Sequence, residues 1–160
     1  MKDYFAFVRT MRHTLTELFE QPWARMYDTV VRSHDGGTKV VYVYEDPQNP
    51  GERGALVVEF AQTGRDSDTW ELLFHRGGEY SNTGTGGASG VFASVLDAAH
   101  RFLGKHHAPM IRFSAGKRGG SDSKARAYTA LVRRFVRDYG YTVKKEKDSA
   151  TARAWLLQKA

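Results

Sequence analysis

The sequence of 160 residues contains no cysteine, and this absence excludes several kinds of chemistry. Disulfides, thiolate zinc sites, iron–sulfur clusters and cysteine nucleophiles all require a thiol. A chain of this length buries about two thirds of its unfolded surface, so it needs neither a disulfide nor a metal ion in order to fold. Apolar residues make up 41% of the chain and aromatic residues 12%. This composition predicts a folded domain with its own core.

Long apolar runs are absent as well. No stretch approaches the roughly 18 residues that a membrane-spanning helix needs. The first ten residues carry Asp3 and Arg9, where a secretory signal peptide would have an unbroken apolar centre. Proline occurs four times, and its one cluster, in residues 46–51, is short enough to be a single loop. The sequence therefore predicts a soluble cytoplasmic protein, with residues 1–160 forming one domain.

Motifs that would identify an active site directly are also missing. The loop at residues 116–121 contains Lys117 and Arg118 between glycines, but it lacks the Gly-Lys-Ser/Thr of a P-loop. No Gly-x-Ser-x-Gly elbow specifies a serine nucleophile. His100, His106 and His107 lie close together in the sequence, but no carboxylate converges on them. We therefore expect no metal site.

The hydrophobic periodicity divides the chain into three regions. Residues 1–21 place apolar side chains at spacings of three and four up to Pro22, which predicts an N-terminal helix. Residues 22–76 contain four runs rich in Val, Tyr, Phe and Trp, separated by turn residues. These runs predict an antiparallel meander of strands over residues 23–32, 39–45, 55–62 and 69–75.

Residues 77–160 alternate between helical and extended patterns. Two apolar stripes at helical spacing predict helices, the first ending at Gly104 and the second at Gly140. Short apolar runs around the second helix predict a single strand and a closing hairpin. In order, the expected elements are a helix from Val91, a strand over 110–115, a helix from Ser121 or Ser123, and strands over 141–146 and 151–157.

This order of elements predicts an α+β fold. A helical crossover normally joins parallel strands, so residues 69–75 and 110–115 should pair in parallel. The rest of the sheet should be largely antiparallel, because short turns connect the strands of the meander and of the closing hairpin. We therefore expect a mixed, mostly antiparallel sheet with one parallel pair, with helices packed on it and an N-terminal helix before it.

Positive charge is concentrated in one segment. The whole chain has a net charge of +6, and residues 117–147 alone have +7, from ten basic and three acidic residues. Such a segment favours a phosphate-bearing ligand, nucleic acid or an acidic protein partner. Long charged side chains also form the solvated faces of helices. The candidate anion contacts are Lys117, Arg118, Lys124, Arg126, Arg133, Arg134 and Arg137.

Two loops are expected at the carboxyl ends of the parallel strands, where ligands bind preferentially. One is the glycine-rich stretch 76–88, and the other is residues 116–121 with their two cations. Glycines permit close backbone approach, and a helix N-terminus attracts anions. The two loops together predict a phosphate-binding site.

The element order and the first loop resemble the GNAT acyltransferase superfamily. In that family the loop Gln/Arg-x-x-Gly-x-Gly/Ala holds the pyrophosphate of acyl-CoA. Residues 81–86 (Ser-Asn-Thr-Gly-Thr-Gly) have this spacing, and Gly140-Tyr141 resembles the family's helix end. More closely, residues 83–95, 111–115 and 121–128 resemble small uncharacterised bacteriophage proteins of GNAT-like fold. The resemblance implies a site for acetyl-CoA or another acyl-CoA at Ser81, Thr83, Gly84, Thr85, Gly86 and Gly87.

The resemblance also implies a general base near the fourth strand, which would take a proton from an acceptor amine. Glu71 is the candidate base, with Glu59 as a second choice. The family's usual acid is a tyrosine five residues before the aromatic of the Gly-aromatic pair, and counting back from Tyr141 gives Val136. Tyr128, more than two turns upstream on the same helix, is the other candidate catalytic residue.

Two other functions stay open on the sequence. A non-catalytic phage accessory protein would bind nucleic acid or an acidic partner through residues 117–147. A virion or structural component would have kept the fold and lost the site. Val136 at the tyrosine position favours these two, whereas the loop at residues 81–87 favours acyl transfer to an amine whose identity the sequence does not give. A phage protein would work in the host cytoplasm.

Overall fold

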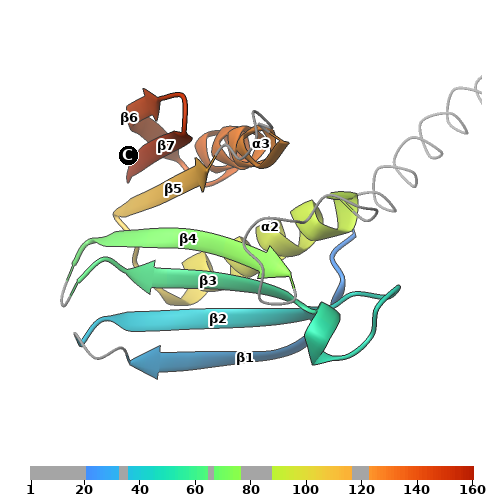
Figure 1. Cartoon of the computed structure of the whole chain (residues 1–160). Coiled ribbons are helices and arrows are strands. Elements are labelled where there is room, and N and C mark those ends of the chain that lie inside the picture. The colour runs from blue at the N-terminus through green and yellow to red at the C-terminus, as the bar shows by residue number, and fades with distance from the viewer. Residues whose placement is uncertain (1–20, 33–35, 65–66, 77–87, 117–122) are drawn as a thin grey trace, which may run out of the picture.

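The computed structural model describes residues 21–32, 36–64, 67–76, 88–116 and 123–160. Within these residues, seven strands form one mixed sheet in the spatial order β1-β2-β3-β4-β5-β7-β6 (Figure 1). The strands are β1 Ala24–Arg32, β2 Thr38–Glu45, β3 Leu56–Gln62, β4 Thr69–Arg76, β5 Met110–Gly116, β6 Tyr141–Asp148 and β7 Ala152–Lys159. The helices of the described residues are the 3-10 helix η1 Glu52–Gly54, α2 Ala88–Lys105 and α3 Ser123–Asp138.

The strand pairing confirms the main features of the predicted sheet. The first four strands form an antiparallel meander. β4 and β5, which α2 connects, pair in parallel, and β6 and β7 form the closing hairpin. The sequence did not indicate that β7 would lie between β5 and β6. This order leaves β1 and β6 at the two edges of the sheet.

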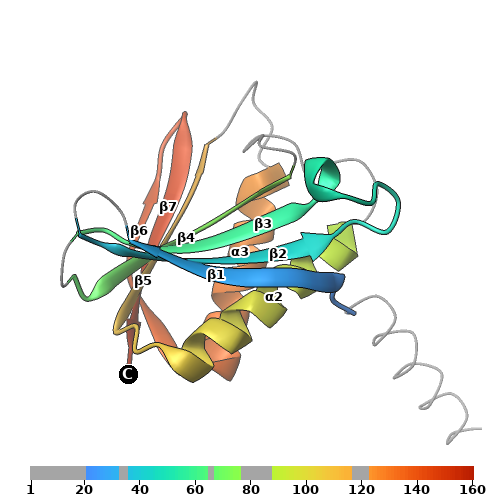
Figure 2. The same ribbon diagram turned by 90° about the horizontal axis from the view of Figure 1, so that it is seen from below.

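Side-chain alternation determines which face of the sheet is buried. Every second residue of the central strands is apolar and faces the side on which both helices lie (Figure 2). At the centre of this core, the Phe102 ring of α2 lies 4.0 Å from the Phe60 ring and 4.9 Å from the Trp70 ring. The buried residues of β2 to β4 on this face are Val40, Tyr42, Tyr44, Leu56, Val58, Phe60, Trp70, Leu72 and Phe74.

A glycine in a left-handed conformation follows the end of α3, at the position where the sequence predicted that the helix would end. Gly140 has a φ of 73°, a left-handed conformation that glycine adopts without steric cost. The Lys159 ammonium group donates a hydrogen bond of 2.6 Å to the Tyr139 carbonyl and so satisfies one of the carbonyls at the helix end. The buried Tyr141 hydroxyl then donates to the Ala108 carbonyl at 2.6 Å, and burial raises the pKa of Tyr141 to about 12. These contacts join the end of α3 to the hairpin.

The N-terminal helix expected over residues 1–21 falls almost entirely outside the described residues. The described chain begins at Gln21, and β1 follows three residues later. α2 begins at Ala88, three residues before Val91, where the apolar stripe indicated its start. It ends at Lys105, next to Gly104, where the sequence predicted its end. Neither α2 nor α3, the helices of eight or more residues in the described ranges, combines the length and apolar composition that crossing a bilayer requires.

Candidate ligand site where β4 and β5 separate

The two parallel strands pair along only part of their length. Backbone pairing runs from Thr69 opposite Met110 to Leu72 opposite Phe113 and then ends. Both strands continue, β4 to Arg76 and β5 to Gly116, and Figure 1 shows them moving apart. We call these separated ends, residues 73–76 of β4 and 114–116 of β5, the fork. Each strand of the fork is paired on its outer side, β4 with β3 and β5 with β7.

A tyrosine of α3 lies against the fork from the helix side of the sheet. The Tyr128 ring is 5.1 Å from the Phe74 ring of β4 and 5.9 Å from the Phe113 ring of β5. Its buried hydroxyl lies beside the Phe74 backbone, yet it has no hydrogen-bond partner of normal geometry in the described part of the chain. Burial raises the pKa of Tyr128, so the hydroxyl keeps its proton at neutral pH. A buried hydroxyl without a partner costs stability, which a ligand with an acceptor atom would recover.

The carboxyl end of β4 lies beside the beginning of α2. The Arg76 guanidinium pairs with the Asp46 carboxylate and lies 5.2 Å from the centre of the Trp23 ring. The Trp23 amide donates to the Ser94 hydroxyl at 2.8 Å, and that hydroxyl donates to the Gly90 carbonyl at 2.6 Å. A helix N-terminus carries about half a positive charge. The first turn of α2 therefore places a weak anion-attracting group next to the fork.

Glycine is required at position 90 by a close contact. A Cβ atom at this position would lie 2.1 Å from the Trp23 indole nitrogen, a distance that no side chain tolerates. The indole ring can therefore pack directly on the helix backbone. The strand pattern over residues 23–32 does not indicate this contact, because alternation says nothing about which helix a tryptophan packs on.

Several ionisable side chains lie on the face of the sheet opposite the helices, close to the fork. Glu71 lies 3.3 Å from the Arg112 guanidinium and 3.4 Å from the Ser114 hydroxyl. The Glu59 carboxylate lies 3.7 Å from the His75 imidazole and 3.6 Å from the Lys39 ammonium group. Of these residues, sequence reasoning singled out only the two glutamates.

The loop residues that the sequence assigned to the ligand lie outside the described ranges. They are Ser81, Thr83, Gly84, Thr85, Gly86 and Gly87, together with Lys117 and Arg118. The two undescribed stretches, 77–87 and 117–122, follow β4 and β5 directly and precede α2 and α3. Their positions in the chain agree with the expected strand-to-loop-to-helix junctions at the fork.

The candidate catalytic residues lie on different sides of the sheet. Tyr128 is on the helix side, and Glu71 is on the other side, close enough for its charge to raise the pKa of the tyrosine slightly beyond the effect of burial. Val136, the position that the family pattern indicated for an acid, is 41% exposed. Val136 therefore lies on the outer surface of α3. The tyrosine that lies at the fork is Tyr128, which is not at the position reached by counting back from Tyr141.

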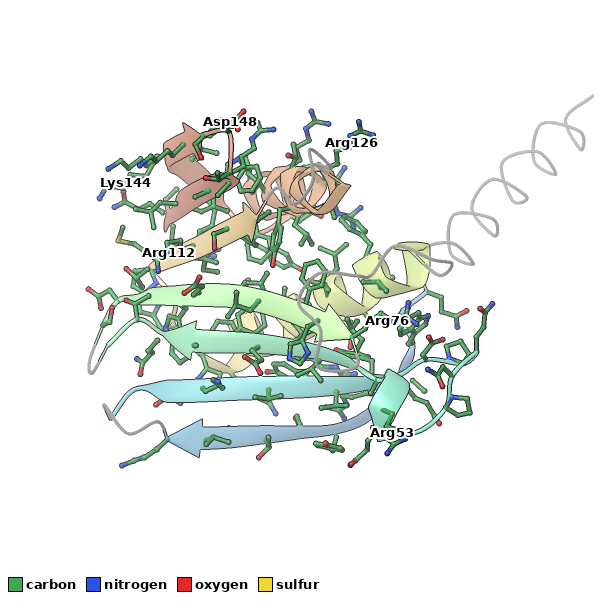
Figure 3. The ribbon with its side chains drawn as sticks, in the orientation of Figure 1. Arg53, Arg76, Arg112, Arg126, Lys144 and Asp148 are labelled. Atoms are coloured by element: carbon green, nitrogen blue, oxygen red, sulfur yellow. The ribbon has the colours of Figure 1, made fainter. Side chains whose placement is uncertain are left out.

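The described basic residues of the segment 117–147 are divided between α3 and β6. Arg126 and Arg133 are exposed on α3, and the Lys124 side chain is outside the described part. Arg134 and Arg137 both pair with Asp138, at 3.1 Å and 2.8 Å, and the hydrogen bond from Arg137 lowers the pKa of that carboxyl. The other described cations of residues 117–147 are Lys144, Lys145 and Lys147, which are exposed on β6. Figure 3 shows Arg126 and Lys144 well apart at this end of the molecule.

The three histidines near the end of α2 do not converge on a common point with carboxylates. Within the described ranges, no group of three His, Asp or Glu side chains is arranged to hold a metal ion. His106 instead stacks on Phe102, with ring centres 5.0 Å apart. Burial lowers the pKa of His106, and the nearby Lys105 charge lowers it further.

Comparison with known proteins gives distant structural likenesses only. No family model and no curated protein sequence matches the chain. Among solved structures, the chain is similar to a "putative acetyltransferase from Sphaerobacter thermophilus DSM 20745", with a TM-score of 0.45 and 12% identity over 87% of this chain and 79% of that one. It is also similar to "a domain from Methanocaldococcus jannaschii DSM 2661", with a TM-score of 0.43 and 9% identity over 79% of this chain and 69% of that one. Likenesses of this size carry no argument about function, so the argument that follows rests on the fork.

Proposed function

We propose that this chain is a GNAT-like acyltransferase, which binds acyl-CoA at the fork and passes the acyl group to an amine. The observation that carries the proposal is the end of the β4–β5 ladder at Leu72 and Phe113, with the buried Tyr128 hydroxyl lying there without a partner in the described residues. The expected glycine-rich loop follows the same strand. The end of the β4–β5 pairing and the buried Tyr128 hydroxyl thus lie at the same place.

The fork suits the shape and chemistry of acyl-CoA. The arm between the pyrophosphate and the thioester is extended and contains amide groups, which hydrogen-bond to a strand in the way that an added strand does. The pyrophosphate would lie toward the N-terminus of α2, where the helix charge attracts anions. In this proposal, Ser81, Thr83 and residues 84–87 supply backbone N–H groups to the phosphates.

The role proposed for Tyr128 follows from its protonation state. Because burial raises its pKa, the hydroxyl is a hydrogen-bond donor at neutral pH. The leaving group of acyl transfer is a thiolate with a pKa near that of free cysteine, about 8.5. A neutral donor next to the sulfur would stabilise that charge as it develops. The same hydroxyl would hold the thioester group in place before reaction.

Binding of acetyl-CoA to the full chain tests the proposal directly. At a hundredfold excess over Kd, acetyl-CoA should add about 2.7 kcal/mol to the free energy of unfolding, seen as a higher melting temperature. Hydrogen exchange of the amides in residues 73–76 should slow on binding. Tyr128→Phe should weaken binding about tenfold, the value of one hydrogen bond, while leaving the free protein as stable as wild type or slightly more stable.

Two analogues serve as controls for the two parts of acetyl-CoA. Desulfo-CoA lacks the sulfur, and adenosine 3′,5′-bisphosphate lacks the whole arm that carries the thioester. The Tyr128→Phe effect should persist with acetyl-CoA and disappear with the bisphosphate, which lacks the thioester arm. An unchanged melting temperature at millimolar acetyl-CoA would refute the proposed function. Slower exchange elsewhere, with residues 73–76 unaffected, would place the ligand away from the fork.

A further inference from the structure

The two edge strands of the sheet differ in their side chains. β6, at one edge, ends in an unbroken run of charged residues from Lys144 to Asp148. Such a run keeps other strands from pairing with an edge, because pairing would bury the charges. β1, at the opposite edge (Figure 1), instead carries large apolar side chains that are 37–61% exposed, namely Met26, Tyr27, Val30 and Val31. β1 is therefore the edge that is suited to pairing.

β1 also has the length and the exposure to accept another strand. It has nine residues, Ala24–Arg32, and every one of them is exposed. Its pairing with β2 uses the backbone groups on one side only. No strand of the described ranges pairs with the N–H and C=O groups on the other side. An added strand would satisfy these groups with main-chain hydrogen bonds.

The charges of β1 favour a second copy of the same strand. Two copies that pair antiparallel are related by a twofold axis, so the residue on the axis faces itself. With Val30 on the axis, Asp28 of each protomer lies opposite the partner's Arg32. Opposite charges at facing positions stabilise a strand pair. An axis at Asp28 would bring two carboxylates together, and an axis at Thr29 would leave Asp28 opposite a valine.

The surroundings of these side chains agree with this alignment. Val30 lies opposite Val40 of β2, which is buried toward the helices. Contact between the two Val30 side chains would therefore extend the apolar layer past the edge of the sheet. Asp28 contacts Arg25 at 3.3 Å through Oδ2, which leaves Oδ1 to accept a hydrogen bond from the partner's Arg32. The exposed contact with Arg25 contributes little stability by itself.

We propose that this chain forms a twofold dimer through antiparallel pairing of β1, with Val30 on the axis. The same surface of both protomers is used, and the charged β6 edges lie at the far ends, so the assembly stops at two copies. One strand from each protomer makes a small interface, so we expect a weak dimer with a micromolar Kd. The fork lies three strands away from β1. The inference is therefore independent of the proposed function.

Sedimentation equilibrium of the full chain tests the dimer. Wild type should change from monomer to dimer between micromolar and near-millimolar concentrations. Val30→Lys places two ammonium groups on the axis and should raise the dimer Kd at least about tenfold. The matched control is Val143→Lys, at an exposed valine of the other edge strand, and it should dimerise like wild type. Because both valines are exposed, neither change should unfold the monomer, which circular dichroism checks.

A charge exchange tests the alignment of the two strands. Arg32→Glu and Asp28→Arg each replace two facing pairs of opposite charge by pairs of like charge. Each single change should raise the dimer Kd about tenfold. The double variant Asp28→Arg/Arg32→Glu restores opposite charges at both positions and should dimerise like wild type. Its net charge equals that of wild type, so the recovery would report the facing pairs.

Cross-linking gives a direct measure of the contact on the axis. The protein contains no cysteine, so Val30→Cys introduces a single thiol into each protomer. Facing residues of an antiparallel pair are close enough for their side chains to form a disulfide. Mild oxidation should therefore convert Val30→Cys into a covalent dimer. Val143→Cys, treated in the same way, should stay monomeric.

The outcomes separate this inference from the proposed function. A chain that is monomeric at every concentration would overturn the dimer. A dimer that survives Val30→Lys, that Val143→Lys disrupts equally, or that the charge exchange does not restore would overturn the pairing through β1 in this alignment. Acetyl-CoA should raise the melting temperature of Val30→Lys as much as that of wild type. Loss of the acetyl-CoA effect in a protein that dimerises as described would contradict the proposed function alone.

Discussion

The two ends of the β4–β5 pair differ in what lies beneath them. Under the paired end, Trp70 packs edge-on against Phe102, and His106 stacks on the same phenylalanine. Under the fork, Tyr128 brings a hydroxyl between Phe74 and Phe113, and polar contacts surround the end of the strands. The backbone pairing of β4 and β5 thus covers the Trp70 end of the strands and stops beside Tyr128.

The largest effect should come from the ion pair at the fork end. Arg76 and Asp46 are mostly buried, with side chains 17% and 6% exposed. Arg76→Ala leaves the Asp46 charge buried without this partner, and removal of one member of a buried pair costs about 3–5 kcal/mol. Urea unfolding measures the loss. Arg25→Ala, which breaks the exposed pair with Asp28, should cost less than about 1 kcal/mol, and equal losses in the two variants would contradict the comparison.

Two glycines of the same helix should respond in opposite directions. Gly90→Ala forces a methyl group against Trp23, so we expect a loss of about 1–3 kcal/mol from overpacking. Gly104 lies toward the paired end and has nothing within 4 Å of its would-be Cβ. Gly104→Ala should therefore stabilise the protein by about 0.5–1 kcal/mol through helix propensity. Thermal unfolding of both variants checks the sign, and a stabilising Gly90→Ala would show that Trp23 does not pack on the helix.

The smallest effect concerns protonation under the paired end. Burial lowers the pKa of His106 in the folded protein, so the folded state favours the neutral ring. Its contribution to stability is present above the unfolded pKa of about 6.5 and is lost as the pH falls through the folded pKa. His106→Phe keeps the stacking on Phe102 and removes the titration. The stability of wild type relative to this variant should fall between pH 7 and pH 5 by less than about 1 kcal/mol, and a constant difference would rule out this contribution.

The order of the elements could be predicted because local signals decide it. Alternation in the meander, helical spacing around Phe102 and Phe135, and the turn at Gly140 are properties of neighbouring residues. The parallel pair followed from the connection through a helix. The first turn of α2 was missed, because residues 88–90 are small and carry no apolar periodicity. The position of β7 was missed, although the charged run of β6 is typical of an edge strand and the apolar residues of β7 are typical of an interior one.

Local patterns in the chain were therefore enough to predict the strands, the two described helices and the parallel pair. Three features depend on packing in three dimensions: where β4 and β5 separate, that Tyr128 rather than position 136 faces the fork, and that His75 meets Glu59. The physical reason is that sheet register and helix rotation are set by the packing of the whole core. Arg76 and Asp46, 30 residues apart, meet only once three strands have aligned, and no local pattern records that alignment.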